Sequence, residues 1–486
     1  MTGHRITLLG SQNRMLQEWL CRHPEGHERG AIVLFRRLAR SVNDQPQSDR
    51  FLAVKVIIMS GDWVLESSAT HLKINMRKLS EIYHQCEANN LEFGFVHNHP
   101  NGYPDFSPTD DVNEHNILHG LSGCNGPNAF FVAMILRKGN WSARIRQGKE
   151  PGKVIPVKHI SIVSDRMELH GIVIPDYSTE ILERQGAAFG KPFNAMLQSL
   201  RVAIVGVGGT GSPVATLLAR AGVGELILID GDDLDKSNLN RVRGYRYADV
   251  GKKKAHALAV YLRHLGLNVS VSSINSILGE SGEAVDALSS ADVIMGCTDD
   301  QAGRDIMNQA MYYHAQVYID VGLTGRIGVD SNGHPYLRDH RGRVSCVLPE
   351  SGACLRCQRV VTDQMLQYEQ RTKENPELVD LDPVTLKREY YLTGGGEQAP
   401  GIGPFTSATA DNAVATLMNL IKPYRDISPE LRPDNIWIDF VHMNIHSNAP
   451  TDDPECIYCR KHLLLLKSEG KYRLEMPKLG EIKTNV

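Results

Sequence analysis

Two histidines separated by one residue, His97 and His99, end the apolar stretch at residues 91–96. Because side chains two positions apart in a strand point to the same face, both imidazoles can reach one metal ion. Asp110, on the polar segment that follows, adds a carboxylate. Two nitrogen ligands, one oxygen ligand and a position open to water are typical of a catalytic zinc site. The spacing therefore predicts a metal-dependent hydrolase.

Hydrolysis at such a site also needs a general base and a hydrogen-bond donor for the developing oxyanion. Ser107 is the candidate donor, three residues before Asp110. Glu28 is the preferred candidate for the base, because it directly precedes an apolar segment that can pack under the site. Glu66 is the alternative.

The combined pattern has the form His-x-His-Pro, a short spacer, then Ser-x-x-Asp, and it resembles the motif of the JAB/JAMM metalloproteases. That family consists of zinc isopeptidases that cleave after the C-terminal glycine of ubiquitin-like proteins. The resemblance covers residues about 20–165 and implies an α+β domain. The sequence departs from the family at residues 28–31, which read ERGA where the family has a glutamate before a Cys-Gly pair.

A second motif, VAIVGVGGTGS at residues 202–212, reads as a buried strand that enters a glycine-rich turn. Gly206, Gly208 and Gly211 satisfy the pattern GxGxxG, which lets backbone N–H groups approach phosphates at a helix N-terminus. Asp232 follows roughly 20 residues later, where an acidic residue holds a ribose. At this point a nicotinamide or flavin dehydrogenase remains an alternative.

The residues beyond Asp232 favour a nucleoside triphosphate. Asn238 and Arg241 are followed by three lysines at 252–254, and Asp299 ends a later apolar strand. Transfer of AMP to a carboxylate expels pyrophosphate, whose negative charge needs such cations. Asp299 suits a magnesium ion, whereas Lys252 and Lys253 are interpreted as part of a solvated helix face.

These residues resemble the ThiF/MoeB family, which shares its fold with the ubiquitin-activating enzymes, over residues about 180–465. The resemblance implies a Rossmann-like adenylation domain with a mixed sheet. It also implies that Arg184, in the segment LERQG, reaches into the site of a partner subunit, so we expect a homodimer. The nucleotide contacts that it implies come from Gly206, Gly208, Gly209, Gly211, Asp232, Asn238, Arg241, Lys254 and Asp299.

Two CxxC pairs, Cys354 with Cys357 and Cys456 with Cys459, lie in the same part of the chain. Four thiolates suit tetrahedral Zn²⁺, and the arrangement resembles the structural zinc site of the ThiF/MoeB family. A redox function of a CxxC pair is the alternative. The predicted site would stabilise the fold and perform no chemistry.

A cysteine nucleophile for a thioester is missing where the family has one, because residues 358–455 contain no cysteine. Thr393 is the candidate replacement and would form an oxyester, although a hydroxyl needs activation by a base. The alternative is that Thr393 only caps a glycine-rich loop. Cys346, just before the zinc ligands, is a second candidate nucleophile.

The chain as a whole has 486 residues, 42% of them hydrophobic, and a net charge of −3. We expect a first domain at residues 1–170 and a second at residues 171–486, with a crossover loop at about 360–400. No apolar run approaches the roughly 18 residues that cross a bilayer, and residues 1–20 lack a signal-peptide core. We therefore expect a cytoplasmic protein without a membrane or nucleic-acid partner.

Both motifs fit one kind of substrate, the C-terminus of a ubiquitin-like protein. The leading hypothesis is a bifunctional enzyme that uses ATP, Mg²⁺, one catalytic Zn²⁺ and one structural Zn²⁺. It would adenylate the C-terminal glycine and also trim precursors or cleave conjugates, as expected in bacterial ubiquitin-like and antiviral operons. A conjugating-enzyme-like protein is a candidate further partner. The alternatives are activation of a sulfur carrier protein for thiocarboxylate formation and a non-catalytic scaffold.

Overall fold

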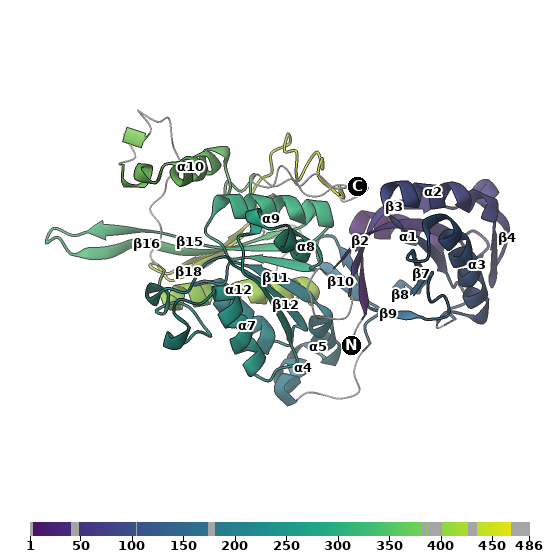
Figure 1. The fold of residues 1–486 in the computed structure, drawn as a ribbon, viewed down its shortest axis with the longest axis horizontal. Coiled ribbons are helices and arrows are strands. Elements are labelled where there is room, and N and C mark those ends of the chain that lie inside the picture. Colours follow the sequence, from purple (N-terminus) through teal and green to yellow (C-terminus); the bar gives the residue numbers. More distant parts are fainter. Residues whose placement is uncertain are drawn as a thin grey trace.

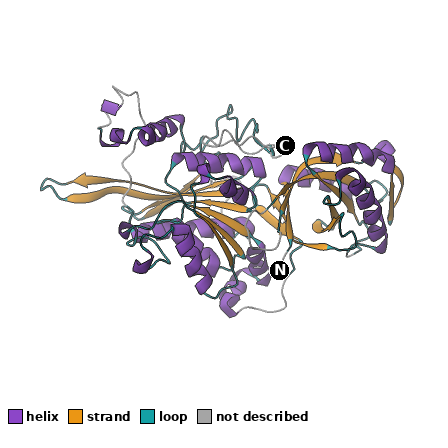
Figure 2. Ribbon diagram, viewed as in Figure 1, coloured by secondary structure: helices purple, strands orange, loops and turns teal. Residues whose placement is uncertain are grey.

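The computed structural model describes residues 3–39, 48–103, 105–173, 180–381, 385–386, 401–425 and 435–467. Figures 1 and 2 show two bodies side by side, each built around its own eight-stranded sheet. The first sheet ends with a strand at Met167–His170, and the next described element begins at Glu180. The sheets therefore divide the chain into an N-terminal and a C-terminal domain.

The N-terminal sheet has the strand order β1-β3-β2-β6-β7-β8-β9-β10, and β9 also pairs with β1, so the sheet closes on itself. The pairs β1–β3, β1–β9 and β6–β7 are parallel. A separate hairpin is formed by β4 (Val64–Ser68) and β5 (His71–Ile74). The strands of the closed sheet are β1 (His4–Leu9), β2 (Gly30–Leu38), β3 (Arg50–Ile58), β6 (Glu92–Asn98), β7 (Phe130–Arg137), β8 (Asn140–Gln147), β9 (Ile155–Val163) and β10 (Met167–His170).

Apolar runs explain why this sheet is covered on both faces. The sequences of β2 and β7 begin GAIVLF and FFVAMIL and are buried along these stretches, as in strands that have no solvent-facing side. Helices α2 (Leu79–Asn89) and α3 (Pro108–Asn125) contribute to one hydrophobic cluster, and α1 (Gly10–Cys21) to another. The result is a mixed α/β domain, and its assignment to the JAB/JAMM family stays a prediction.

The C-terminal sheet has the order β13-β12-β11-β14-β15-β16-β17-β18. The strands β13 to β15 of this order are parallel, and β16, β17 and β18 extend the sheet in antiparallel fashion. This is the expected Rossmann-like arrangement with a mixed sheet. Its strands are β11 (Arg201–Val205), β12 (Glu225–Ile229), β13 (Ser270–Ile274), β14 (Val293–Gly296), β15 (Val317–Val329), β16 (Pro335–Val347), β17 (Asn435–Asp439) and β18 (Asn444–Asn448).

Helices cover both faces of the C-terminal sheet (Figure 1). One hydrophobic cluster packs α5, α6, α7 and α12 on one face, and a second packs α8 and α9 on the other. Both faces of the parallel strands are therefore buried, which leaves their carboxyl edge as the place for a ligand. The helices are α4 (Glu183–Phe189), α5 (Lys191–Ser199), α6 (Gly211–Arg220), α7 (Lys254–His264), α8 (Gly282–Ser289), α9 (Gln301–His314), α10 (Asp363–Glu374) and α12 (Gly403–Ile421).

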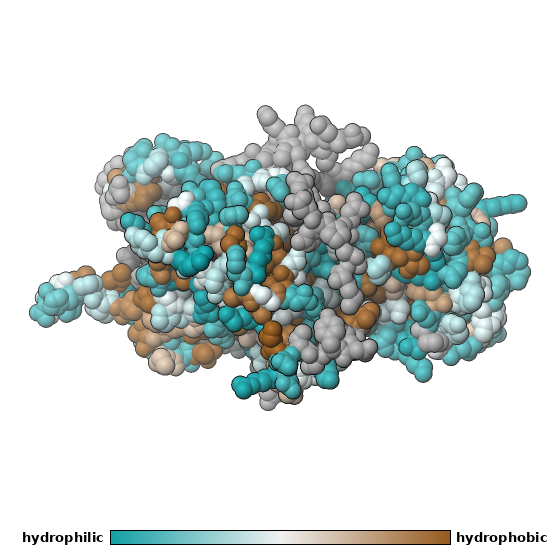
Figure 3. Space-filling view, turned by 60° about the horizontal axis from the view of Figure 1, so that its bottom comes forward, coloured by the Kyte–Doolittle hydropathy of each residue, from teal (hydrophilic) through white to brown (hydrophobic). Residues whose placement is uncertain are grey.

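The hairpin of β15 and β16 extends beyond its neighbours as an arm (Figure 2). Of the residues of β16, only Arg341–Ser345 pair with β17, so the outer part of the arm consists of β15 and β16 without a third strand. Ile327 and Val329 on the arm are 51% and 67% exposed. Figure 3 shows further hydrophobic surface near the base of the arm. Since a two-stranded hairpin is only marginally stable in water, the arm is a candidate contact surface.

Buried charges join the two domains. Arg5 Nη2 of β1 lies 3.0 Å from Glu225 Oε2 of β12, and Arg5 Nε lies 3.2 Å from Asp292 Oδ2. Arg50 of β3 donates from Nη2 to the carbonyl oxygen of His314 at 2.8 Å, at the C-terminus of α9. Because buried charges are costly unless they are paired, these contacts fix the two domains relative to each other.

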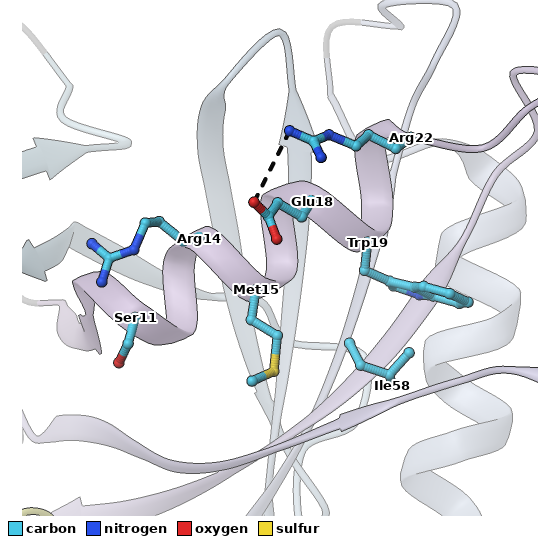
Figure 4. A pocket seen from close by; sticks show the side chains of 7 residues that line it. All are labelled: Ser11, Arg14, Met15, Glu18, Trp19, Arg22 and Ile58. Atoms are coloured by element: carbon cyan, nitrogen blue, oxygen red, sulfur yellow. Dashed lines mark ion pairs between the residues drawn. The ribbon is translucent and has the colours of Figure 1, made fainter.

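A shallow recess lies over α1 (Figure 4). Glu18 and Arg22 form an exposed ion pair of 4.0 Å along its rim. The recess contains none of the predicted site residues. Separately, no helix among the described residues is long and apolar enough to cross a membrane. Its lining consists of Ser11, Arg14, Met15, Glu18, Trp19, Arg22 and Ile58.

Candidate functional site

The three predicted metal ligands of the N-terminal domain converge. His97 lies near the end of β6 and His99 directly after it, as predicted, and Asp110 lies in the first turn of α3. His97 Nε2 is 3.1 Å from Asp110 Oδ1, and His99 Nε2 is 3.6 Å from Asp110 Oδ2. One donor atom from each residue lies within 4.8 Å of the others. This set of two nitrogens and one oxygen fits a zinc ion.

Ser107 is the N-cap of α3 and holds Asp110 in place. Its backbone N–H donates to Asp110 Oδ2 at 2.6 Å, and its hydroxyl donates to the same oxygen at 2.7 Å. Although burial acts in the opposite direction, hydrogen bonds with His97 and His99 keep the pKa of Asp110 well below its usual range. In this arrangement the Ser107 hydroxyl orients a carboxylate, which differs from its predicted role as a free oxyanion donor.

The two candidate bases lie in different surroundings. Burial raises the pKa of the Glu28 carboxyl, while His97 and His99 lower it, so Glu28 is within electrostatic reach of both histidines. The Glu66 side chain is 62% exposed and forms a 2.9 Å ion pair with Lys73. Glu28 lies on the segment that enters β2, whose first residue, Gly30, is the register partner of His97, whereas Glu66 pairs with Lys73 on the β4–β5 hairpin.

The glycine-rich turn of the C-terminal domain joins β11 to α6. Gly206 has φ of +80°, a conformation that favours glycine. A Cβ atom on Gly211 would lie only 1.8 Å from the carbonyl oxygen of Gly206. Gly208 and Gly209 lie between them, and a Cβ atom on Gly209 would lie 3.3 Å from Arg241 Cδ. The turn is therefore tight at both ends and lies beside a cationic side chain.

Asp230 was missed by the sequence analysis. It follows β12 directly, accepts the N–H of Val207 in the glycine-rich turn at 2.7 Å, and accepts the N–H of Asp232 at 2.9 Å. The Asp232 side chain is 67% exposed and pairs with Lys254 Nζ at 2.8 Å. The signal was the sequence IDGD, in which the first acid ends the strand and the second lies farther out.

The remaining predicted nucleotide residues lie after the same strands. Asn238 is at the end of a short 3-10 turn, where its Oδ1 accepts the N–H of Asp235 at 3.2 Å. Arg241 donates to the Ser237 carbonyl at 2.7 Å. Asp299 is an exposed residue between β14 and α9. The carboxyl edge of the parallel strands thus carries the glycine turn, two cations and several carboxylates.

Arg184 lies away from the glycine-rich turn of its own chain. It is exposed on α4. Leu182, the residue just before α4, contacts the region of Gly222, where a Cβ atom would lie 2.6 Å from Leu182 Cδ1. Gly222 follows the C-terminal end of α6, whereas the glycine-rich turn precedes its N-terminal end. Thr393 lies outside the described residues.

The four cysteines of the CxxC pairs form one cluster, with all sulfur atoms within 4.8 Å of one another. The distance from Cys354 Sγ to Cys456 Sγ is 3.7 Å, and that from Cys357 Sγ to Cys459 Sγ is 3.6 Å. These distances are too long for disulfides and match the edge of about 3.8 Å of a tetrahedron with Zn–S bonds of about 2.3 Å. The cluster therefore fits a zinc ion.

The other two cysteines of this domain are poorly placed for catalysis. Cys346 on β16 and Cys297 after β14 are 8% and 9% exposed. Burial raises the pKa of the Cys297 thiol, which disfavours the reactive thiolate. Cys297 instead packs against the glycine-rich turn, since a Cβ atom on Gly211 would lie 3.1 Å from its Cβ.

A model of the ThiF family matches residues 182–458. The chain belongs to the ThiF family. The match begins just before α4 and ends one residue before Cys459, so it includes the glycine-rich turn, the carboxyl edge and the first three cysteines of the cluster. It does not include the His97 and His99 site, which lies upstream.

Curated relatives resemble parts of this ThiF chain. It is 44% identical over 119 residues to an adenylyltransferase and sulfurtransferase uba4 of Aspergillus terreus, covering 24% of each chain. It is 38% identical over 135 residues to the sulfur carrier protein ThiS adenylyltransferase of Escherichia coli, covering 28% of this chain and 52% of the relative. A ubiquitin-like modifier-activating enzyme 5 of rice is 25% identical over 286 residues, covering 56% and 59%. The chain thus spans about a quarter to three-fifths of these relatives.

Solved structures of E. coli MccB are among those similar to part of the chain. The complex of MccB with ATP has a TM-score of 0.43 and 22% sequence identity, and it covers 59% of this chain and 76% of MccB.

Proposed function

We propose that this ThiF-family chain is an ATP-dependent adenylyltransferase that activates the C-terminal carboxylate of a sulfur carrier or ubiquitin-like protein. The supporting observation is the carboxyl edge of the parallel sheet. There the glycine-rich turn lies beside Arg241, and the Lys254 ammonium group pairs with Asp232. Backbone N–H groups at the start of α6 and these cations suit the phosphates of a nucleotide.

The sulfur carrier becomes the leading substrate class, although the sequence analysis favoured a ubiquitin-like conjugation system. Two relatives quoted above are named for sulfur carrier or sulfurtransferase chemistry. The absence of cysteine from residues 358–455 agrees with this choice, because an enzyme that stops at the acyl-adenylate needs no thioester nucleophile. Conjugation through Thr393, a conjugating-enzyme partner and an antiviral setting remain the second hypothesis.

In the proposed reaction, a carboxylate oxygen of the carrier attacks the α-phosphorus of ATP. The new O–P bond forms as the bond between the α- and β-phosphates breaks, and pyrophosphate leaves. Arg241 and Lys254 neutralise the phosphate charge, and Asp230 holds the glycine-rich turn through the Val207 N–H. Asp299 would hold Mg²⁺, which supplies further neutralisation of the leaving pyrophosphate.

Exchange of radiolabelled pyrophosphate into ATP tests this proposal. The assay needs the full chain, ATP, magnesium and a purified carrier protein with a C-terminal glycine. We expect exchange that depends on the carrier and disappears when its C-terminal glycine is deleted. If no candidate carrier, including one of the ThiS class, supports exchange and the chain does not bind ATP, the adenylyltransferase proposal is refuted.

We further propose that the N-terminal domain is a zinc hydrolase acting on the same C-terminus. His97, His99 and Asp110 would hold the ion, and zinc would lower the pKa of water for attack on an amide carbonyl. Glu28 accepts the proton from water and returns it to the leaving amine. Ser107 fixes the Asp110 carboxylate through two hydrogen bonds. Such an activity would trim a carrier precursor to its C-terminal glycine.

The Glu28→Gln variant is expected to lose about 10²–10⁴-fold of this hydrolysis, because the amide cannot accept the proton. The measurement is the release of a fluorophore linked by an amide bond to a peptide ending in Gly-Gly, with bound zinc quantified in parallel. Glu66→Gln is the matched control and is expected to keep the activity, since Glu66 pairs with Lys73 on the surface. Equal losses in both variants would contradict the assignment of Glu28.

We also propose a homodimer in which Arg184 serves the partner's nucleotide site. Arg184 lies near the C-terminal end of α6, away from the glycine-rich turn of its own chain. If Arg184→Ala and Lys254→Met chains are mixed equally, half of the dimers carry one intact site. We expect the mixture to recover about a quarter of the wild-type exchange activity. No recovery above the separate variants would contradict the exchange of Arg184 between subunits.

A further inference from the structure

A buried charged cluster lies beside the predicted nucleotide residues and has no assigned role. Its centre is Asp320 of β15, which is fully buried. Arg304 Nε of α9 lies 3.3 Å from Asp320 Oδ1, and Arg343 Nη2 of β16 lies 2.6 Å from Asp320 Oδ2. Tyr318 donates its hydroxyl to Asp320 Oδ1 at 2.9 Å. Arg304 and Arg343 are only 9% and 7% exposed.

Two buried arginines meet at one buried carboxylate in this cluster. Two guanidinium groups share the single Asp320 carboxylate, whose pKa stays low because both arginines outweigh the effect of burial. Asp300 is nearby, but it caps α9 by accepting the Gly303 N–H at 2.7 Å. Asp299 is the proposed magnesium ligand. The Asp299 and Asp300 carboxylates, at the less buried start of α9, also attract Arg304, so what the cluster offers an anionic ligand depends on which atoms of the Arg304 guanidinium are unpaired.

Arg304 presents part of its guanidinium group to that ligand. Its Nε contacts Asp320, and its Nη1 donates to the Asp299 carbonyl at 3.4 Å. Within the described part of the chain, no hydrogen bond uses its Nη2. A Cβ atom on Gly322 would lie 3.6 Å from Arg304 Nη2 and 2.8 Å from Arg343 Nη2. Both guanidinium groups therefore lie near the backbone of Gly322. A side chain there would displace Arg343, whereas its Cβ atom would only contact Arg304.

We propose that Arg304 binds the C-terminal carboxylate of the protein substrate before its adenylation, with Arg343 and Gly322 fixing the position of the guanidinium group. This inference rests on the proposed adenylyltransferase function. The carboxylate must approach a triphosphate of the same sign, and a bound cation removes that repulsion. Arginine suits the task because it pairs with carboxylates through two parallel hydrogen bonds and keeps its proton throughout.

The location agrees with this role. Gly296 of β14 is the register partner of Asp320, so the cluster lies at the carboxyl edge of the parallel strands. The helix α9 that carries Arg304 begins just after Asp299. A carboxylate held by Arg304 is thereby brought beside the residues proposed to hold the nucleotide and its magnesium ion.

The test compares two short fluorescein-labelled peptides ending in Gly-Gly, one with a free carboxylate and one with a carboxamide. Binding is measured by fluorescence anisotropy at saturating AMPCPP. We expect the wild-type chain to prefer the carboxylate by about tenfold or more. Arg304→Met is expected to reduce this preference to below about threefold, with an unchanged affinity for AMPCPP. Arg304→Lys is expected to restore part of it, since it returns the charge without the forked geometry.

Gly322→Ala is a second variant that changes no charge and is also expected to weaken the preference, which decides the question if Arg304→Met does not fold. Arg341→Met is the matched control, because Arg341 lies on the same strand as Arg343 but pairs with Asp439 at 3.2 Å. Equal binding of both wild-type peptides, or no binding of either at about 1 mM, would overturn the inference. So would a preference that persists in both Arg304→Met and Gly322→Ala. Loss of AMPCPP binding by the wild type would instead refute the adenylyltransferase.

Discussion

The Cys357→Ser variant is expected to lose one zinc ion per chain and more than about 5 kcal/mol of stability, because structural zinc sites contribute about 10–16 kcal/mol of apparent binding free energy. The cluster joins two segments that are distant in sequence, at Cys354 and Cys357 and at Cys456 and Cys459. Leu355 and Tyr458, within these segments, are buried in the core that packs α8 and α9. Releasing the metal therefore also loosens this face of the sheet.

Zinc content by mass spectrometry and thermal unfolding with and without a chelator check this expectation. Cys21→Ser is the matched control, since Cys21 is exposed at the end of α1 and outside the cluster. The control is expected to keep the zinc content and melting temperature of the wild type. If Cys357→Ser does the same, the cluster holds no structural metal, and the redox alternative for the CxxC pairs has to be considered.

Local signals in the sequence are sufficient to predict those parts of the two sites that lie on a single helix, strand or turn. The alternation around His97 and His99 predicts the strand β6, and the helix starting at Pro108 follows from the polar segment that carries Asp110. The glycine spacing predicts the turn from β11 into α6. In each case the residue types restrict the backbone, and the backbone then fixes where the functional atoms can lie.

Contacts between distant segments are not predictable from such signals. Asp230 and Asp232 are both acidic and near the strand end, and only the structure shows that Asp230 contacts the glycine-rich turn. Arg5 reads as a surface residue of an N-terminal strand, yet it is fully buried against Glu225 of the other domain. The first contact depends on the pairing of β11 with β12 in one sheet, and the second on how the two sheets pack.

The packing of the domains also bears on how two activities share one chain. Arg50 of the N-terminal domain donates to the carbonyl oxygen of His314, at the C-terminus of α9. Asp299 lies near the opposite end of this helix, just before its N-cap. The paired buried charges resist separation of the domains. We therefore expect the two sites to keep a fixed separation, so that a carrier protein leaves one site to reach the other.

The Lys254→Met variant is expected to lose about 10³-fold or more of the carrier-dependent pyrophosphate exchange, which corresponds to about 4 kcal/mol of transition-state stabilisation. The Lys254 side chain is 12% exposed and is held by Asp232 at 2.8 Å, at the start of α7. A cation in this position can neutralise charge that develops on the leaving pyrophosphate. Methionine keeps most of the volume and removes only the charge.

Lys253→Met is the matched control, because Lys253 is the adjacent residue, is 44% exposed and pairs with Asp233 at 3.1 Å. Its exchange activity is expected to stay within about threefold of the wild type, since exposed ion pairs contribute little. A large loss in Lys254→Met alone would mean that the Lys254 ammonium group contacts the phosphates. Lys253 would then be a solvated residue without a role in exchange. Equal losses in both variants would mean that the lysines attract the carrier or ATP only through their summed charge, and would contradict a specific contact from Lys254.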